Sequence, residues 1–156
     1  MTHTKNPSNI IVYTSTNRQS RPINQFFEEY DVEVIERRVS RSFEPLTEKE
    51  VIKILNAAGG FHEILAERTK VYKEKIGPLL HKGEITVNEL IQFIIKNPSV
   101  LRYPIIIDDK RCEVGYNVET IRAFLPRTVK NRFFKQALEY ASHFQDKFYN
   151  NNAIGL

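Results

Sequence analysis

The sequence predicts an α/β fold, and two patterns along the chain support that prediction. In the first, residues 10–14 form a short β-branched run typical of a buried strand, and the alternation over residues 32–39 predicts a second strand. The helical pattern of residues 21–30 lies between them, with Pro22 in its first turn. A strand, a helix and a strand of these lengths form a βαβ unit with a right-handed crossover.

The second pattern is a β-hairpin followed by a helix. The apolar run 104–107 predicts a buried strand, Asp108 begins the turn, and residues 112–116 predict the returning strand. Asn117 is then predicted to cap a helix. A hairpin and helix reached through an Arg-x-Pro turn, here residues 102–104, are typical of the second half of a thioredoxin-like domain.

Between these units lies a predicted helical insertion, residues 46–97. Thr47 and Glu50 form a capping box that opens its first helix, and the Gly59–Gly60 pair ends that helix. Thr86 is predicted to cap a later helix. The predicted fold is therefore a thioredoxin-like α/β domain with an inserted helical lobe.

Residues 128–149 predict a final amphipathic helix. We expect its phenylalanines to pack onto the domain; a dimer or partner face is the alternative for Phe133, Phe134, Phe144 and Phe148. The predicted organisation is a flexible extension over residues 1–9, a single domain over residues 10–149, and a flexible tail over residues 150–156.

Composition limits the classes of function. The 156 residues carry a net charge of +4, which permits contact with DNA or an acidic partner without predicting either. The single cysteine, Cys112, excludes an intrachain disulfide and a multi-cysteine metal site. The chain has no apolar run long enough to span a membrane and no apolar signal core, so we expect a cytoplasmic protein without membrane contact. No cofactor or metal is predicted.

Two segments resemble one family closely. The wording L-R-x-P-I-I-I-D-x-K-R over residues 101–111, and V-G-Y-N-x-x-x-I-R-x-F-L-P-R over residues 114–127, is similar to the Spx branch of the Spx/ArsC family. Spx members are transcription regulators that bind RNA polymerase, and the resemblance implies that role and the ArsC/Spx-type fold. Pro104 also stands where thioredoxin-like folds usually place a cis-proline, so we expect a cis bond there, with Tyr103 or its backbone near Arg18.

The resemblance breaks at the family's redox position. Spx proteins carry a C-x-x-C disulfide switch at the start of the first helix, where the helix N-terminus lowers a cysteine's pKa. Arg18 and Arg21 fill those two places here. Arginine forms no disulfide and is no nucleophile, so we expect neither arsenate reductase activity nor disulfide control.

The two arginines and the cysteine each admit two interpretations. Arg18 and Arg21 are either solvated residues where a switch has been lost, or they hold an anion together with backbone N–H groups of the helix. Cys112 is either a half-buried strand thiol or a sensor that forms an intermolecular disulfide.

The resemblance also implies a partner surface. Gly60 matches the family glycine that contacts the C-terminal domain of the RNA polymerase α subunit, and a bare backbone lets another chain approach closely. The predicted polymerase-binding residues are Gly60, Gly59, Asn56, Arg18 and Arg21. The alternative is that Gly59 and Gly60 only end a helix.

Two basic residues are the predicted contacts to promoter DNA within the polymerase complex. Arg68 and Lys70 match family positions linked to that contact, although such residues on a short helix usually form a solvated face. The structural turn before the hairpin is Arg102, Tyr103 and Pro104, in which Tyr103 replaces a second family arginine.

The leading hypothesis is a non-enzymatic, Spx-like transcriptional regulator that lacks thiol control and binds the C-terminal domain of the RNA polymerase α subunit. The alternative is a non-catalytic, ArsC-like sensor that binds an anion or small ligand. The resemblance also implies an ATP-dependent protease as a partner of the C-terminal tail, but the ending of this chain, residues 152–156, differs from the family's usual one.

Overall fold

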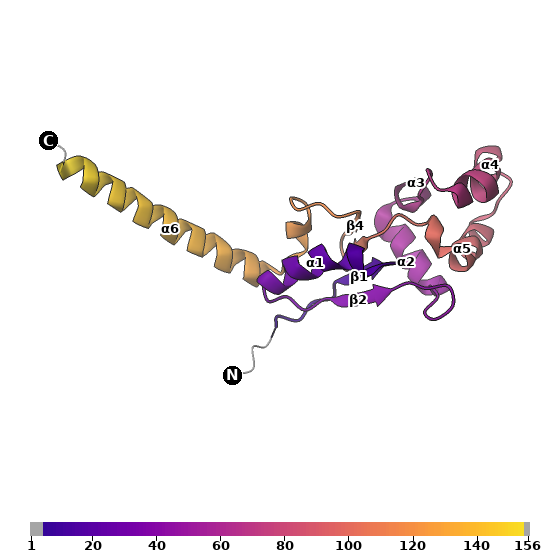
Figure 1. The fold of residues 1–156 in the computed structure, drawn as a ribbon, viewed down its shortest axis with the longest axis horizontal. Coiled ribbons are helices and arrows are strands. Elements are labelled where there is room, and N and C mark those ends of the chain that lie inside the picture. Colours follow the sequence, from indigo (N-terminus) through magenta and orange to yellow (C-terminus); the bar gives the residue numbers. More distant parts are fainter. Residues whose placement is uncertain (1–4, 155–156) are drawn as a thin grey trace. The chain divides into compact units, whose positions relative to one another are not determined.

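The computed structural model describes residues 5–154 and contains a four-stranded mixed sheet (Figure 1). β1 and β2 run parallel, with Ile11 opposite Ile35, and β3 runs antiparallel to both β1 and β4. The βαβ unit and the hairpin therefore share one sheet, which confirms the predicted α/β fold. The spatial order is β2-β1-β3-β4, and the strands are β1 (Ile11–Thr14), β2 (Ile35–Arg38), β3 (Ile105–Ile107) and β4 (Cys112–Val114).

Helices fill the connections between the strands. α1 (Asn17–Glu29) joins β1 to β2. The insertion between β2 and β3 contains α2 (Glu48–Ala58), α3 (Phe61–Ile64), the π-helix η1 (Tyr72–Ile76), α4 (Gly77–Lys82), α5 (Val87–Lys96) and the 3₁₀-helix η2 (Pro98–Val100). The 3₁₀-helix η3 (Ile121–Phe124) and α6 (Arg127–Ile154) follow β4.

The predicted helix caps are confirmed. Both capping boxes are present, one at Thr47 with Glu50 and one at Thr86 with Glu89. The Oδ1 atom of Asn117 accepts a hydrogen bond of 2.8 Å from the backbone N–H of Glu119, ahead of the 3₁₀-helix that stands where an α-helix was expected. Local capping chemistry therefore located the starts of α2 and α5 from the sequence alone.

α1 begins four residues before the predicted start. Thr16 is its N-cap and accepts a hydrogen bond from the backbone N–H of Gln19. Pro22 consequently lies inside the helix, where it has no N–H to offer the carbonyl of Arg18. The cap and the apolar face that α1 buries outweigh this missing bond. Arg18 and Arg21 therefore stand on the first two turns of the helix.

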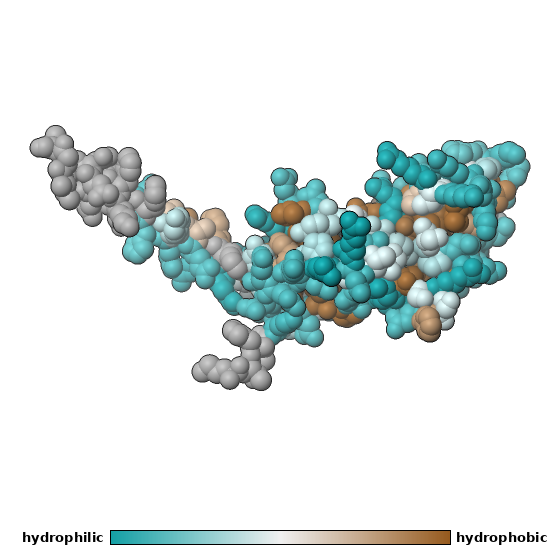
Figure 2. All heavy atoms as spheres, in the orientation of Figure 1, coloured by the Kyte–Doolittle hydropathy of each residue, from teal (hydrophilic) through white to brown (hydrophobic). Residues whose placement is uncertain are grey.

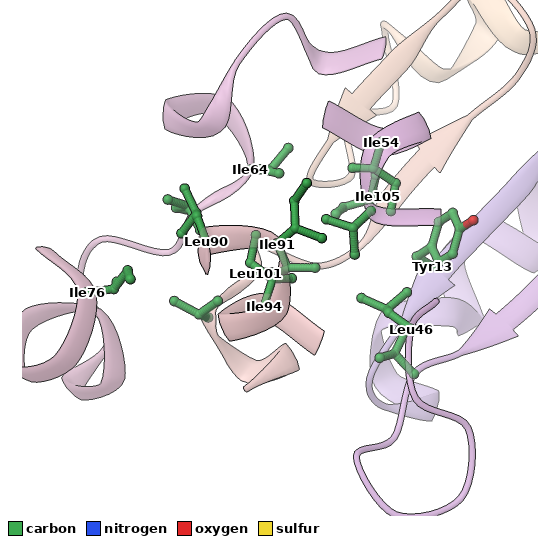
Figure 3. Close-up of a cluster of buried hydrophobic side chains, with 14 of the residues drawn as sticks. Tyr13, Leu46, Ile54, Ile64, Ile76, Leu90, Ile91, Ile94, Leu101 and Ile105 are labelled. Carbon is green, nitrogen blue, oxygen red and sulfur yellow. The ribbon is translucent and has the colours of Figure 1, made fainter. Parts of the chain in front are cut away.

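One core joins the inserted lobe to the sheet. Figure 3 shows Ile54 of α2 beside Ile105 of β3 and Tyr13 of β1, with the side chains of α5 adjoining them. Ile105 and Ile54 are almost completely excluded from solvent, so each contributes about 1.5–3 kcal/mol of burial free energy. The lobe is therefore part of the same packed body as the sheet.

The segment 5–9 is held against the sheet, whereas a flexible extension was predicted for residues 1–9. Asn6 pairs with Val32 as an isolated parallel bridge, and the backbone N–H of Asn6 donates to the carbonyl of Asp31 at 2.6 Å. The Nδ2 group of Asn9 donates to Asp109 at 2.9 Å. Residues 1–4 lie outside the described part of the chain.

The chain divides into two compact units, one reaching to residue 124 and one beginning at residue 125, whereas one domain over residues 10–149 was predicted. The second unit is largely α6, which continues past the predicted end at residue 149 to Ile154. Of the four phenylalanines predicted to pack onto the domain, Phe134 is exposed. The structure does not describe the side chains of Phe133, Phe144 and Phe148. Within residues 5–154, the helices are too short or too polar to cross a membrane.

Candidate functional site

A crevice of about 560 Å³ opens where β1 ends and α1 begins. The chain segments that meet there come from the β1–α1 connection, the end of β2, the segment after α3, and the turn before β3. The crevice is lined by Ser15, Gln19, Val39, Ser40, Arg41, Ala66, Pro98, Ser99, Leu101, Arg102 and Tyr103. Ser15 and Gln19 lie close in the chain to Arg18 and Arg21, the two positions where the family carries its cysteines, but neither arginine lines the crevice.

Tyr103 fills one wall of the crevice. The peptide bond between Tyr103 and Pro104 is cis, as predicted. Burial raises the pKa of Tyr103 well above its ordinary value, so its hydroxyl stays protonated and donates a 2.7 Å hydrogen bond to the carbonyl of Pro98. Tyr103 lines the crevice together with Ser15 and Gln19.

Local hydrogen bonds occupy two backbone N–H groups at the start of α1, those of Ser15 and Gln19. Oε1 of Gln19 accepts from the backbone N–H of Ser15 at 2.8 Å and from its hydroxyl at 3.2 Å. The hydroxyl oxygen of Thr16 accepts a hydrogen bond from the backbone N–H of Gln19. Because these groups bond within the chain, they are not available to an anion held between Arg18 and Arg21. Both arginine side chains are exposed.

A second hollow of about 520 Å³ brings Arg68 and Arg102 together, although separate roles were predicted for them. It adjoins the crevice, since Arg102 and Ala66 line both. The backbone N–H of Arg102 donates to the carbonyl of Ile64 at 2.8 Å, which ties the turn before β3 to α3.

Nearby carboxylates reduce the net positive charge of the predicted DNA-contacting residues. Lys70 pairs with Glu74 at 3.9 Å, and His62 lies 3.4 Å from Glu67. Exposed pairs of this kind contribute about 0.2–1 kcal/mol at most. The positive charge around Arg68 and Lys70 is therefore weaker than the local run of basic residues indicates.

Gly59 and Gly60 form an open junction between α2 and α3. The N–H of Gly59 donates to the carbonyl of Leu55 at 3.1 Å, and its φ of 81° is the left-handed conformation that ends a helix. A Cβ atom added at either glycine would meet no atom within 4 Å. Gly59 therefore ends the helix, and the junction also presents bare backbone at the surface.

Asn56 lies in a third hollow, of about 640 Å³. Lys49 and Lys53 of α2 line it together with Lys110 of the β3–β4 turn. These lysines were not predicted as site residues, although their spacing of four residues places Lys49 and Lys53 on one helix face. Asp108 shares this hollow, and its Oδ1 atom accepts from the backbone N–H groups of Lys110 and Arg111.

Arg37 is a further residue that was not predicted from the sequence. Its guanidinium binds Glu50 through two hydrogen bonds of 3.1 Å, and only about 20% of its side chain is exposed. Burial favours a higher pKa for Glu50, but hydrogen bonds from Arg37 and Thr47 outweigh burial and hold that pKa below its usual range. Hydrogen bonding to Glu50 likewise raises the pKa of Arg37.

Cys112 lies on β4 and is partly buried. Burial, with a smaller contribution from the charge of Glu113, raises the pKa of its thiol to about 11. The thiolate is the reactive form of cysteine, and little thiolate exists at neutral pH when the pKa is so high. This favours the interpretation of Cys112 as a half-buried strand thiol.

The mixed sheet, the cis-proline turn and the crevice at the start of α1 define a thioredoxin-like domain with a helical insertion. Solved structures of similar fold agree with this assignment. An arsenate reductase from Vibrio cholerae superposes with a TM-score of 0.61 at 15% identity, covering 77% of this chain and 100% of the other. An ArsC family related protein from Bacteroides fragilis gives 0.60 at 17% identity, covering 77% and 100%. At these identities the likeness concerns the fold alone.

The chain belongs to the ArsC family, whose model matches residues 37–124. It is 39% identical over 118 residues to the global transcriptional regulator Spx of Streptococcus mutans, covering 75% of this chain and 82% of the relative. It is 37% identical over 130 residues to global transcriptional regulator Spx 1 of Oceanobacillus iheyensis, covering 82% and 95%. The predicted family and fold are thereby confirmed, and the one cysteine of the chain, Cys112, cannot form a C-x-x-C motif.

Proposed function

We propose that this protein is an Spx-like transcriptional regulator that binds the C-terminal domain of the RNA polymerase α subunit, alters promoter use and works without thiol control. The observation that carries the proposal is the similarity, at 37–39% identity, to relatives named global transcriptional regulators. Because those alignments cover 82–95% of the relatives, the likeness extends over most of their length.

The geometry of the glycine junction supports the partner assignment. Gly59 and Gly60 leave open space where any side chain would project, so a second chain could approach their backbone. Asn56 lies one turn earlier on α2, and Arg18 and Arg21 are exposed on α1. We assign these five residues to the polymerase contact. Arg68 and Lys70, also exposed, are assigned to promoter DNA, where a few phosphate contacts suffice if polymerase holds the complex.

The absence of thiol control and of enzyme activity belongs to the same proposal. Arginines stand at the two positions where the family's cysteines would act, and an arginine side chain cannot be oxidised to a disulfide. The raised pKa of Cys112 makes that thiol a poor substitute.

The test is a titration of the purified protein against the isolated C-terminal domain of the polymerase α subunit. We expect wild type to bind and Gly60→Arg to bind at least tenfold more weakly. Gly83→Arg is the matched control, since Gly83 is also a left-handed glycine whose added Cβ meets nothing within 4 Å. No binding by wild type, or equal binding by wild type and Gly60→Arg, would refute the polymerase assignment.

One observation favours the second candidate, an anion-binding sensor. Arg41 and Arg102 line the crevice, and no carboxylate is among its described lining residues. A sensor predicts that phosphate or arsenate raises the melting temperature of wild type and not that of Arg102→Gln. An unchanged melting temperature of wild type with either anion would exclude this candidate.

A further inference from the structure

The loop between β2 and α2 contains a tight turn, residues 40–44, here called the Phe43 turn. Ser40 and Glu44 pair as an isolated antiparallel bridge, and the N–H of Ser40 donates to the carbonyl of Glu44 at 3.1 Å. The hydroxyl of Ser40 accepts from the N–H of Phe43 at 3.3 Å. These bonds close the turn and fix the direction in which its tip projects.

The guanidinium of Arg37 also binds the turn through hydrogen bonds. Nη1 of Arg37 donates to the carbonyls of Arg38 and Glu44, at 2.9 and 3.1 Å. Nη2 donates to the carbonyl of Pro45 at 2.8 Å, while the other donors of Arg37 are bound to Glu50. The chain just before the turn and the chain at its far end are thus tied to one mostly buried side chain. The conformational entropy of this segment is lost on folding and need not be lost again on binding.

The braced turn presents an aromatic side chain to solvent. Phe43 is 89% exposed, the highest value among the exposed large apolar residues that the structure describes. In Figure 2, tan atoms protrude at the lower right, where Figure 1 places the β2–α2 loop. Single exposed apolar residues are common, but a rigid turn that holds one outward matches the aromatic anchors that dominate protein interfaces.

Two arginine side chains line the crevice beside the turn, those of Arg41 and Arg102. Arg41, on the same turn, makes no hydrogen bond or ion pair through its side chain with any described residue, and it lines the crevice together with Arg102. The carboxylate of Glu44 is engaged by Arg37 at 3.3 Å. No carboxylate from the described residues lines the crevice. Guanidinium groups in this setting favour carboxylates of a partner, which they bind in a two-pronged geometry.

We propose that the Phe43 turn is a preformed second contact for the protein partner of this chain. Phe43 enters an apolar socket on the partner, and Arg41 and Arg102 receive carboxylates at the socket's rim. The proposal rests on the proposed function, because the partner assigned is the C-terminal domain of the polymerase α subunit. The contact lies on a segment separate from the glycine junction, so the two can be tested independently.

The experiment measures the affinity of the α-subunit domain for wild type, Phe43→Ala, Arg41→Gln and Phe134→Ala at low and moderate salt. We expect Phe43→Ala to weaken binding about tenfold or more, as interface anchors do. Arg41→Gln should weaken binding several-fold and reduce its salt dependence. Phe134→Ala removes another largely exposed phenylalanine, 68% exposed, and should stay within twofold of wild type.

Three outcomes would overturn the inference. If Gly60→Arg loses affinity while Phe43→Ala stays within twofold of wild type, the inference fails and the proposed function stands. If wild type does not bind the domain, both fail. If Phe43→Ala leaves affinity unchanged but alters the sedimentation of the protein alone, the turn mediates a contact between copies of this chain. A thermal melt of Phe43→Ala should match wild type, because the lost side chain is exposed.

Discussion

Arginine side chains behave differently at the start of α1 and at the β2–α2 turn. Arg18 and Arg21 stand exposed on α1, and neither side chain makes a hydrogen bond or ion pair with the described residues. Arg37 is mostly buried and joins β2, the Phe43 turn and α2 through its guanidinium. Arg18 and Arg21 are therefore solvated charges, whereas the mostly buried Arg37 binds the backbone of neighbouring segments.

The largest effect is expected when the guanidinium of Arg37 is removed. Arg37→Gln should lower the free energy of unfolding by about 2–4 kcal/mol, because it leaves the partly buried Glu50 and several carbonyls without their donor. Urea denaturation measures the loss. Arg21→Gln is the control and should change stability by no more than about 0.5 kcal/mol. Equal losses in the two variants would contradict the distinction between the regions.

Acid should weaken the same network. The pKa of Glu50 is lower in the folded than in the unfolded protein, so its contribution to stability is complete above about pH 4.3 and is lost as pH falls through the folded value. Wild type should therefore lose unfolding free energy more steeply on acidification than Glu50→Gln. Urea titrations between pH 3 and 6 provide the comparison; parallel curves would show that Glu50 does not contribute in this way.

Cys112 offers a test of the proposed absence of thiol control. Its pKa of about 11 predicts slow alkylation of the native protein at pH 7.5, rising steadily toward pH 11, with rapid reaction after unfolding. Mass spectrometry after timed iodoacetamide treatment measures the rate. Diamide should leave binding to the α-subunit domain unchanged in wild type. A diamide effect that disappears in Cys112→Ser would instead identify a working thiol sensor.

The smallest effects are expected at α1. Arg18→Gln should leave the thermal response to phosphate unchanged, because Arg18 is exposed and the backbone N–H groups of Ser15 and Gln19 already bond within the chain. Differential scanning fluorimetry with and without phosphate is sufficient. A phosphate-dependent shift that Arg18→Gln abolishes would restore the anion-binding interpretation of this helix start.

The sequence was informative wherever the determining interactions are local. The capping box at Thr47, the cap at Thr86 and the hairpin turn after Ile107 depend on residues within a few positions of one another, and the likeness to thioredoxin-like folds located the cis bond at Pro104. The start of α1 was misplaced because Pro22 was taken as a first-turn signal, while the cap at Thr16 is the stronger determinant.

The candidate site depended on contacts that span the chain. Arg41, Gln19 and Tyr103 line one crevice only because the fold brings three separate segments together, and no periodic pattern in the sequence indicates this. The role of Arg37 was hidden for the same reason, since its partner Glu50 lies 13 residues away in another element. The spacing of Lys49 and Lys53 was visible in the sequence but provided no indication that Lys110 would face them.

Glu50 has a consequence for the opposite end of α2. One oxygen accepts from the N–H and hydroxyl of Thr47, and both oxygens bind Arg37, so one carboxylate fastens the first turn of the helix to the sheet. At 1.5 Å per residue, the distance along α2 from Glu50 to Gly60 is roughly 15 Å. A tilt of about 10° at the fastened end would displace the glycine junction by roughly 2.5 Å. The ion pair at one end of α2, together with the packing of its buried side chains, therefore helps to determine where the glycine junction at the other end lies.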